Sequence, residues 1–383
     1  MKKYLLSVAV MVMGTTLLTG CLGDDSNGGD TPTEIVVTKG ALVINNGSSN
    51  QSIDGSLTFF DAMSGAAEAD IYKKVNGKRL GGTANDVLVY GQKVYVVGSD
   101  ENTIFVLDSR NYKELKQVST TDLLGDADGH TPRRIIAYED KVYFTTYGGY
   151  VAAIDTISFS LKEKFQVGSY PEGLAVGGNT TAMLYVANSD WSMGNGDISV
   201  IDLASKSVST IKPDKVKNPQ EILAAGTTLY VLDYGHYNDD YSQQVDAGVY
   251  RIDGNNNVKL VVPNATGMTG YGYTIYTFND PWGSTTGVTY SAYNIEYDVL
   301  STLSLYGDTA HPIIAPAAIS IDPNTGNMYI ASRPKDPDTG YPSYALPGFV
   351  NVYSSTGQYI SYFDTGVEPH KIEFSYGTQK IIY

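Results

Sequence analysis

Residues 171–202 read PEGLAVGGNTTAMLYVANSDWSMGNGDISVID and contain the most complete copy of a unit that recurs along the chain. It opens on Pro171, which suits the first position of a strand because a missing N–H costs little there. Two further segments, LYV at 184–186 and ISVID at 198–202, are β-branched or aromatic and follow polar turn residues. Such segments predict β-strands. The stretch therefore predicts a unit of short strands, the last of which ends in Asp202.

The same unit recurs along the chain. An Asp that ends an apolar strand stands at positions 61, 108, 155, 202, 253 and 298, which advance by 47, 47, 47, 51 and 45 residues. Tyr353-Ser354 is a further copy without the acid. Four strands in a repeat of this length predict a β-propeller blade. The Tyr-containing strands lie at 94–96, 142–144, 184–186, 229–231 and 328–330, and the opening prolines are Pro132, Pro171, Pro219, Pro312 and Pro369.

We therefore predict an all-β fold, a seven-bladed β-propeller of four-stranded blades whose ring closes between the N- and C-terminal strands. The first blade, from about residue 41, lacks a Pro-start strand, and residues 369–374 supply one. Residues 42–44 and 380–383 compete for the neighbouring position in that blade, and the blade over 270–310 is weakly marked. No segment shows a helical period. We expect the strand-end Asp residues to stabilise turns and the repeated Tyr residues to pack between blades.

Residues 171–202 match almost completely the blade motif of the YncE-like, surface-layer-type propellers, Pro…Gly-Leu-Ala…Leu-Tyr-Val-Ala-Asn…Ile-Ser-Val-Ile-Asp. The other blades match in part, and the chain resembles this family over roughly residues 41–374. The Trp-Asp, Gly-His and kelch marks of other propellers do not recur. The resemblance is specific for the fold and implies little about function.

The N-terminus resembles a bacterial lipoprotein signal. Two lysines precede an apolar stretch at residues 5–18, which is too short for a comfortable membrane span. Leu-Thr-Gly-Cys at 18–21 resembles a lipobox, and an acidic, Gly-rich tract follows Cys21. Such a tract resembles the surface-export signal of Bacteroidetes lipoproteins, so we expect an outer-membrane, lipid-anchored protein exposed at the cell surface. The alternatives are an ordinary signal with an incidental Cys and a plain solvated linker.

These features divide the chain into three parts. We predict a signal peptide over residues 1–20, a flexible tether over 21–34 with Cys21 as the lipidation site, and a single propeller domain over 35–383. Cys21 is the only cysteine, so no disulfide is expected in the mature protein. With 41 acidic against 26 basic side chains the formal net charge is -15. Without clustered Lys and Arg, that balance argues against a nucleic-acid partner.

Strand alternation puts the loops between second and third strands, and the loops between blades, on one rim of a propeller. The sequence has long loops there, including 188–195, 233–241 and 333–344, and both of its Trp residues. Amphipathic aromatics around a concave face favour ligand binding, while the alternative is that they only pack on one another. The expected ligand-binding residues are Tyr147, Tyr150, Tyr170, Trp191, Tyr234, His236, Tyr237, Trp282, Arg333, Tyr341, Tyr344 and His370.

Metal and catalytic patterns are weak in this sequence. The four His residues fall on the same rim, but no pair within a loop has ligand spacing. Asp336-Pro-Asp-Thr-Gly340 weakly resembles a calcium-binding loop, with Asp at alternating positions followed by Gly, but the terminal glutamate of such a loop is missing. No nucleophile elbow is present. We therefore expect no metal, no cofactor and no catalytic residues.

A lipobox, an acidic tether, a YncE-like propeller and an aromatic polar rim together resemble the BtuG family of cobalamin-capturing lipoproteins. That resemblance implies a corrinoid ligand passed to a TonB-dependent outer-membrane transporter. A wide rim of Tyr, Trp, Asn and Asp suits a broad, amide-fringed ring better than a narrow pocket does. Two alternatives remain open: a surface propeller that binds a glycan or a protein, and a propeller lyase or hydrolase.

Overall fold

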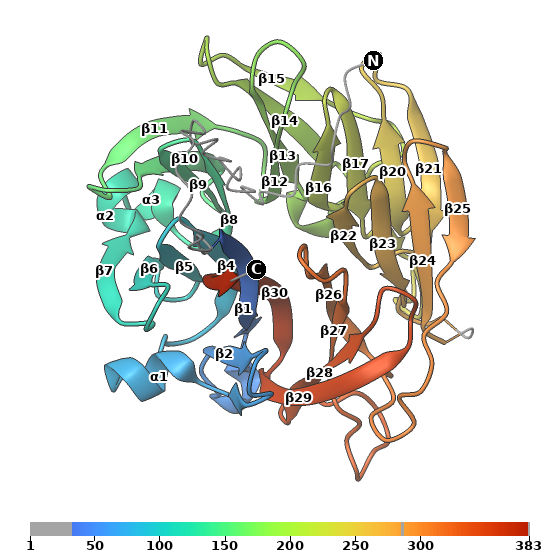
Figure 1. Ribbon diagram of the computed structural model, residues 1–383. Helices are drawn as coiled ribbons and strands as arrows, with labels where there is room; N and C mark the ends of the chain where they lie inside the picture. The colour runs from blue at the N-terminus through green and yellow to red at the C-terminus, as the bar shows by residue number, and fades with distance from the viewer. Residues whose placement is uncertain (1–32, 285–286, 382–383) are drawn as a thin grey trace, which may run out of the picture.

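The computed structural model describes residues 33–284 and 287–381, and these form seven four-stranded antiparallel blades arranged in a ring (Figure 1). The predicted fold class is confirmed. Each blade is given from its innermost to its outermost strand. Blade 1 consists of β30 (Pro369–Ile381), β1 (Thr33–Asn45), β2 (Ser56–Asp61) and β3 (Ala67–Glu68), and blade 2 of β4 (Ala84–Tyr90), β5 (Lys93–Gly98), β6 (Thr103–Asp108) and β7 (Glu114–Ser119). Blade 3 consists of β8 (Pro132–Tyr138), β9 (Lys141–Thr146), β10 (Tyr150–Asp155) and β11 (Leu161–Gln166), blade 4 of β12 (Pro171–Gly177), β13 (Met183–Asn188), β14 (Asp197–Asp202) and β15 (Val208–Ile211), and blade 5 of β16 (Pro219–Ala225), β17 (Thr228–Asp233), β20 (Gly248–Ile252) and β21 (Val258–Pro263). Blade 6 consists of β22 (Gly267–Tyr271), β23 (Thr274–Asn279), β24 (Thr289–Asn294) and β25 (Val299–Thr302), and blade 7 of β26 (Pro316–Ile321), β27 (Met328–Ser332), β28 (Pro347–Tyr353) and β29 (Tyr359–Val367).

Blade 1 closes the ring between the two ends of the chain, as predicted. In Figure 1 the blue β1 lies beside the red β30, and the two strands pair antiparallel from Thr33↔Ile381 to Asn45↔Pro369. The competition expected between residues 42–44 and 380–383 does not arise, because β30 is one continuous strand along the whole of β1. Each innermost strand pairs on one side only, and its other edge faces the central cavity instead of the surrounding solvent.

The hydrophobic core is divided among the interfaces between blades. Seven clusters of buried residues each join two neighbouring blades. The second-strand tyrosines belong to these clusters, which confirms the prediction that they pack between blades. They are Tyr95, Tyr143, Tyr185, Tyr230 and Tyr329, all buried.

The strand-end aspartates stabilise turns, as the repeat predicted, with the exception of Asp298. Strand β24 ends at Asn294, whose side chain accepts the turn N–H bonds of Glu296 and Tyr297, and Asp298 pairs with Lys259 instead. The Asp155 carboxylate accepts backbone N–H bonds from Ile157 and Ser158 at 3.0 and 2.7 Å. Asp61 and Asp202 do the same with the residues two and three positions further on. A carboxylate that satisfies two turn donors has a structural role and is not available to a ligand.

The structure corrects two details. Three short helices lie in loops between blades, where no helix was expected, because four to six residues are too few to show a helical period. Pro312 does not open a strand, since the innermost strand of blade 7 begins at Pro316.

No helix among residues 33–284 and 287–381 is long and apolar enough to cross a membrane. The helices are α1 (Ile71–Asn76), α2 (Thr120–Leu124) and α3 (Asp126–Gly129), with 3-10 turns η1 (Ser49–Gln51) and η2 (Asp190–Ser192) and a loop hairpin of β18 (His236–Tyr237) and β19 (Gln244–Val245).

Candidate ligand-binding mouth

One end of the ring, which we call the mouth, is where the seven innermost strands begin. Because neighbouring strands are antiparallel, the loops between second and third strands and the loops between blades reach this same end. Four of the innermost strands after blade 2 begin with Pro132, Pro171, Pro219 and Pro316, and the C-terminal β30 begins with Pro369. The rim expected from the sequence therefore exists as one face of the molecule.

Three of the predicted residues form an aromatic cluster on the mouth, between blades 3 and 4. The ring centroids of Tyr147 and Tyr170 lie 5.0 Å apart, and Trp191 lies 5.6 Å from the first and 5.2 Å from the second. Trp191 is 59% exposed. Tyr170 and Trp191 both have φ of 50°, a left-handed conformation that bulky residues seldom adopt. Thr131 and Glu368 have the same conformation before Pro132 and Pro369, so at Tyr170 it is a feature of the repeat.

A buried ion pair supports this aromatic cluster from below. Glu172 is 2% exposed, and its carboxylate accepts bonds from Arg133 Nε at 3.1 and 3.2 Å and from the Tyr147 hydroxyl at 2.5 Å. Arg133 also lies 4.7 Å from the centre of the Tyr147 ring. Burial, and then the Glu172 charge, raise the pKa of Tyr147. The phenol therefore stays protonated, and it donates its hydrogen bond to a carboxylate that holds the ring in place.

Blade 7 repeats this arrangement of arginine, glutamate and tyrosine. Arg333 Nε donates to both oxygens of Glu368, at 2.9 and 2.8 Å. The Arg333 guanidinium lies 5.0 Å from the centre of the Tyr344 ring, which is 55% exposed. Glu368 precedes Pro369 and has φ of 58°. The mouth thus holds two aromatic side chains, each placed against an arginine that is itself fixed by a carboxylate.

A second aromatic group lies over blades 5 and 6. Trp282 Nε1 donates to the Tyr241 carbonyl at 3.2 Å, and the Tyr237 and Tyr241 rings lie 6.1 Å apart. Gln244 of the hairpin exchanges two hydrogen bonds with the Trp282 backbone. His236 of the same hairpin lies 3.9 Å from Asp246. These contacts tie the two long loops together.

The remaining predicted residues are more scattered. Tyr150 starts β10 and packs under Lys164, whose Nζ is 4.4 Å from the ring centre. Tyr341 lies 75% exposed in the blade 7 loop. Tyr234 and His370 line the central cavity instead of the rim. Cys21 lies outside the described residues.

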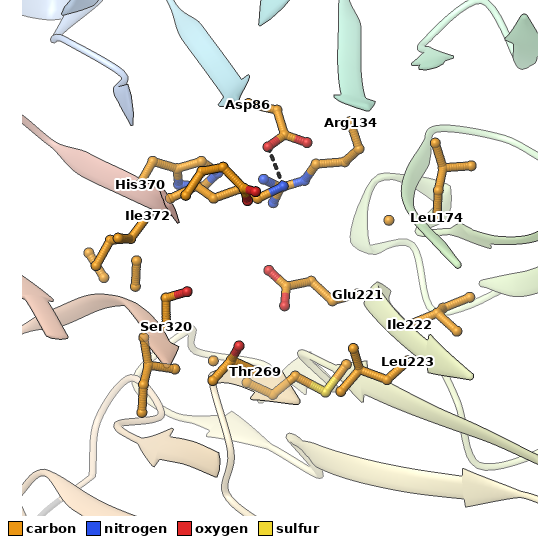
Figure 2. Close-up of a pocket in the computed structure, with 18 of the residues that line it drawn as sticks. Asp86, Arg134, Leu174, Glu221, Ile222, Leu223, Thr269, Ser320, His370 and Ile372 are labelled. Atoms are coloured by element: carbon orange, nitrogen blue, oxygen red, sulfur yellow. Dashed lines mark ion pairs between the residues drawn. The ribbon is translucent and has the colours of Figure 1, made fainter. Parts of the chain in front are cut away.

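The central cavity has a volume of about 200 Å³ and is lined by residues from all seven innermost strands. Charged side chains surround its mouth end, where Lys371 Nζ lies 2.6 Å from Asp86 Oδ1 (Figure 2). Arg134 and Glu221 also face this space (Figure 2). The Nε2 atom of His370 is buried without a hydrogen bond, and burial followed by the charge of Arg134 lowers its pKa well below the ordinary value.

Sequence reasoning missed the charged residues of the cavity, although a signal was present. Arg134, Glu221 and Lys371 each stand two positions after the proline that opens an innermost strand, and Asp86 stands two positions after Ala84. A charge at the same place in four repeats indicates a shared position around the axis.

The calcium-like loop has a structural explanation. Asp336 Oδ1 accepts backbone N–H bonds from Asp338 and Thr339 at 2.9 and 2.8 Å, and a bond from the Thr339 hydroxyl. This carboxylate stabilises its own turn. Within the described part of the chain, no group of three or more His, Cys, Asp or Glu side chains is placed to hold a metal ion.

The fold and this mouth define a seven-bladed propeller with an aromatic, charged face. Residues 39–225 match a family model described as "Domain of unknown function (DUF5074)", a stretch that runs from β1 to the end of β16. A comparison with curated proteins finds no significant match.

Two solved structures show the likeness in fold. Hydrazine synthase from Kuenenia stuttgartiensis is 14% identical with a TM-score of 0.55, over 76% of this chain and 93% of that chain. A functionally unknown protein from Desulfotomaculum acetoxidans DSM 771 is 12% identical with a TM-score of 0.58, over 88% of this chain and 99% of that chain. Identities this low indicate a common fold and carry no function over.

Proposed function

We propose that this chain is a non-enzymatic protein that captures a broad polar ligand at the mouth of its propeller. The observation that carries the proposal is the cluster of Tyr147, Tyr170 and Trp191, exposed to solvent yet fixed from below by Glu172 and Arg133. Aromatic side chains offer large contact area at low entropy cost, and fixing them before binding lowers that cost further.

The specific ligand we propose is a corrinoid. Its wide ring needs flat aromatic surfaces spread over several blades, and its fringe of amides needs charged and polar partners between them. The mouth has aromatic groups over blades 3 and 4, over blades 5 and 6, and on blade 7, with Arg333 beside the last. A glycan needs similar aromatic surfaces, and glycan binding is the outcome to pursue if a corrinoid does not bind.

We also propose that Cys21 anchors the protein to the outer membrane and that the ligand passes to a TonB-dependent transporter. The direction of β1 supports the first part. Because Asn45 pairs with Pro369 at the mouth, Thr33 at the start of β1 lies at the opposite end of the ring. A chain tethered before residue 33 therefore presents its mouth away from the anchor, which suits capture from the surroundings.

The test is a titration of the anchor-free protein with cobalamin, followed by calorimetry and by intrinsic fluorescence. The chain contains two Trp residues, Trp191 and Trp282, and both lie on the mouth, so fluorescence reports on this face. We expect saturable quenching, and loss of about 2 kcal/mol or more of binding free energy in Trp191→Ala, mainly through faster dissociation. Tyr297→Ala is the matched control, because Tyr297 is 72% exposed in a turn at the opposite end.

Two results would count against the proposal. Absence of cobalamin binding at high micromolar concentration would reject the corrinoid. Binding that survives truncation of Trp191, Tyr237 and Tyr344 in turn would place the ligand elsewhere than on the mouth.

A further inference from the structure

The central cavity holds two opposite charges that do not pair with each other. Arg134 comes from β8 and Glu221 from β16, and both face the same space (Figure 2). Between them the corresponding position of β12 is Gly173, where a Cβ atom would lie 2.7 Å from the backbone of Glu221. The glycine allows β12 and β16 to approach closely and adds no side chain to the gap.

Two neighbouring charges are already matched, while Glu373, which also lines the cavity, has a pKa that burial raises to about 7. Asp86 pairs with Lys371 at 2.6 Å, and Glu172 pairs with Arg133 and lies 3.7 Å from Arg134 Nε. Arg134 Nε makes no hydrogen bond to any described residue, although Arg134 is only 9% exposed. Within residues 33–284 and 287–381 the Glu221 carboxylate likewise makes no hydrogen bond or ion pair. An unused donor and a half-buried carboxylate therefore face one small cavity, and the unmet hydrogen bond of the buried Arg134 donor is costly.

The charge balance selects the kind of group that fits between them. A carboxylate would pair with Arg134 but lie against Glu221, and an ammonium group would pair with Glu221 but lie against Arg134 and Lys371. Burial raises the pKa of Glu221, and the charge of Arg134 offsets part of that rise. A neutral group that carries an acceptor and a donor side by side satisfies both residues without adding charge.

We infer that the cavity is a subsite for a primary carboxamide, whose oxygen accepts from the Arg134 guanidinium and whose NH₂ group donates to the Glu221 carboxylate. The cavity volume of about 200 Å³ is sufficient for such a group and a short alkyl stem. Apolar side chains, among them Leu88, Leu223 and Ile319, line the space beside the charges and suit the stem. The inference deepens the proposed ligand capture at the mouth, but it is tested without a corrinoid.

The experiment compares three probes of equal length, namely propionamide, propionate and propylammonium. Binding is followed by NMR of the histidine rings, because the chain has four His residues and His370 lines the cavity. We expect propionamide to shift the His370 signal saturably, with an affinity about tenfold or more above those of the two charged probes. His370→Gln assigns the signal.

Two variants test the role of each charge. Glu221→Gln removes the negative charge and should shift the preference about tenfold towards propionate, while Arg134→Gln should shift it towards propylammonium. Glu68→Gln, on the outer strand of blade 1, is the control and should leave the preference unchanged. Circular dichroism verifies folding, and Glu221→Gln alone is sufficient if Arg134→Gln does not fold.

Three results would overturn the inference: no saturable shift with propionamide, equal affinities for the three probes, or an unchanged preference in Glu221→Gln. The first is expected if water alone bridges the two charges. Cobalamin titrated in parallel separates this inference from the proposed function. Propionamide that binds while cobalamin does not would reject the corrinoid and keep the subsite, and the reverse pattern would reject the subsite alone.

Discussion

Replacing Glu172 by Gln should destabilise the propeller strongly, because this one carboxylate holds the aromatic cluster to the ring. Glu172 is 2% exposed and is contacted by Arg133, Arg134 and the Tyr147 hydroxyl. The change keeps the side-chain shape but leaves two arginines without their counter-ion. Removing one partner of a buried ion pair costs about 3–5 kcal/mol, and since Arg133 is 19% exposed we expect the lower end, about 3 kcal/mol.

The assay is equilibrium unfolding in urea followed by circular dichroism. The unfolding free energies of the variant and the wild type are compared with the same dependence of free energy on urea concentration for both. Asp140→Asn is the matched control, since Asp140 also pairs with a cation, Lys141, at 2.9 Å but its side chain is 69% exposed. Loss of a solvent-screened surface pair of this kind should change the unfolding free energy far less than Glu172→Gln does. Equal effects of the two changes, or a cost below about 1 kcal/mol for Glu172→Gln, would refute the reasoning.

Further predictions concern the ring, the anchor and pH. Deleting residues 369–383 removes β30 together with its buried Ile372 and Phe374. We therefore expect a loss of more than about 5 kcal/mol of unfolding free energy, or aggregation in thermal melts. An unchanged melting temperature would contradict ring closure. Cys21→Ala should release the protein from membranes in cell fractionation without altering its melting temperature, and a variant that stays membrane-bound would reject the anchor. Burial raises the pKa of Glu373 to about 7, above its unfolded value, so its contribution to stability is complete below the unfolded pKa and is lost as pH rises through about 7. Glu373→Gln should therefore be more stable than the wild type at pH 8 by about 3 kcal/mol and lose this advantage near pH 4, which unfolding curves at the two pH values would measure; an advantage that does not change with pH would show that Glu373 does not titrate in this way.

The repeat made the fold predictable because each blade repeats the same physical solution. An Asp that closes a turn and a Tyr that fills the interface to the next blade recur at fixed spacing, as Asp155 and Tyr143 do in blade 3. Where packing differs, the signal weakens. The sequence predicts competition between residues 380–383 and 42–44 for one position, because it does not show that β30 continues along the whole of β1.

The site was predictable only at the level of the rim. Composition placed Tyr147, Tyr170 and Trp191 on one face, but it did not show that their rings meet, since this depends on the left-handed backbone at Tyr170 and Trp191. Tyr234 and His370 were expected on the rim and line the cavity instead: His370 belongs to the innermost strand β30, and Tyr234 directly follows β17. The pairing of Arg133 with Glu172 joins different blades, and such contacts follow from ring geometry that sequence spacing does not specify.

Hydroxyl-radical footprinting with and without cobalamin tests whether the mouth is the functional face of the propeller. Exposed side chains are available at both ends of the ring, with Trp191 and Tyr344 at the mouth and Met63 and Tyr297 in turns at the opposite end. We predict that saturating cobalamin slows oxidation of Trp191 and Tyr344 and leaves Met63 and Tyr297 unchanged. Protection of Met63 and Tyr297 with the mouth still reactive would contradict a functional role of the mouth.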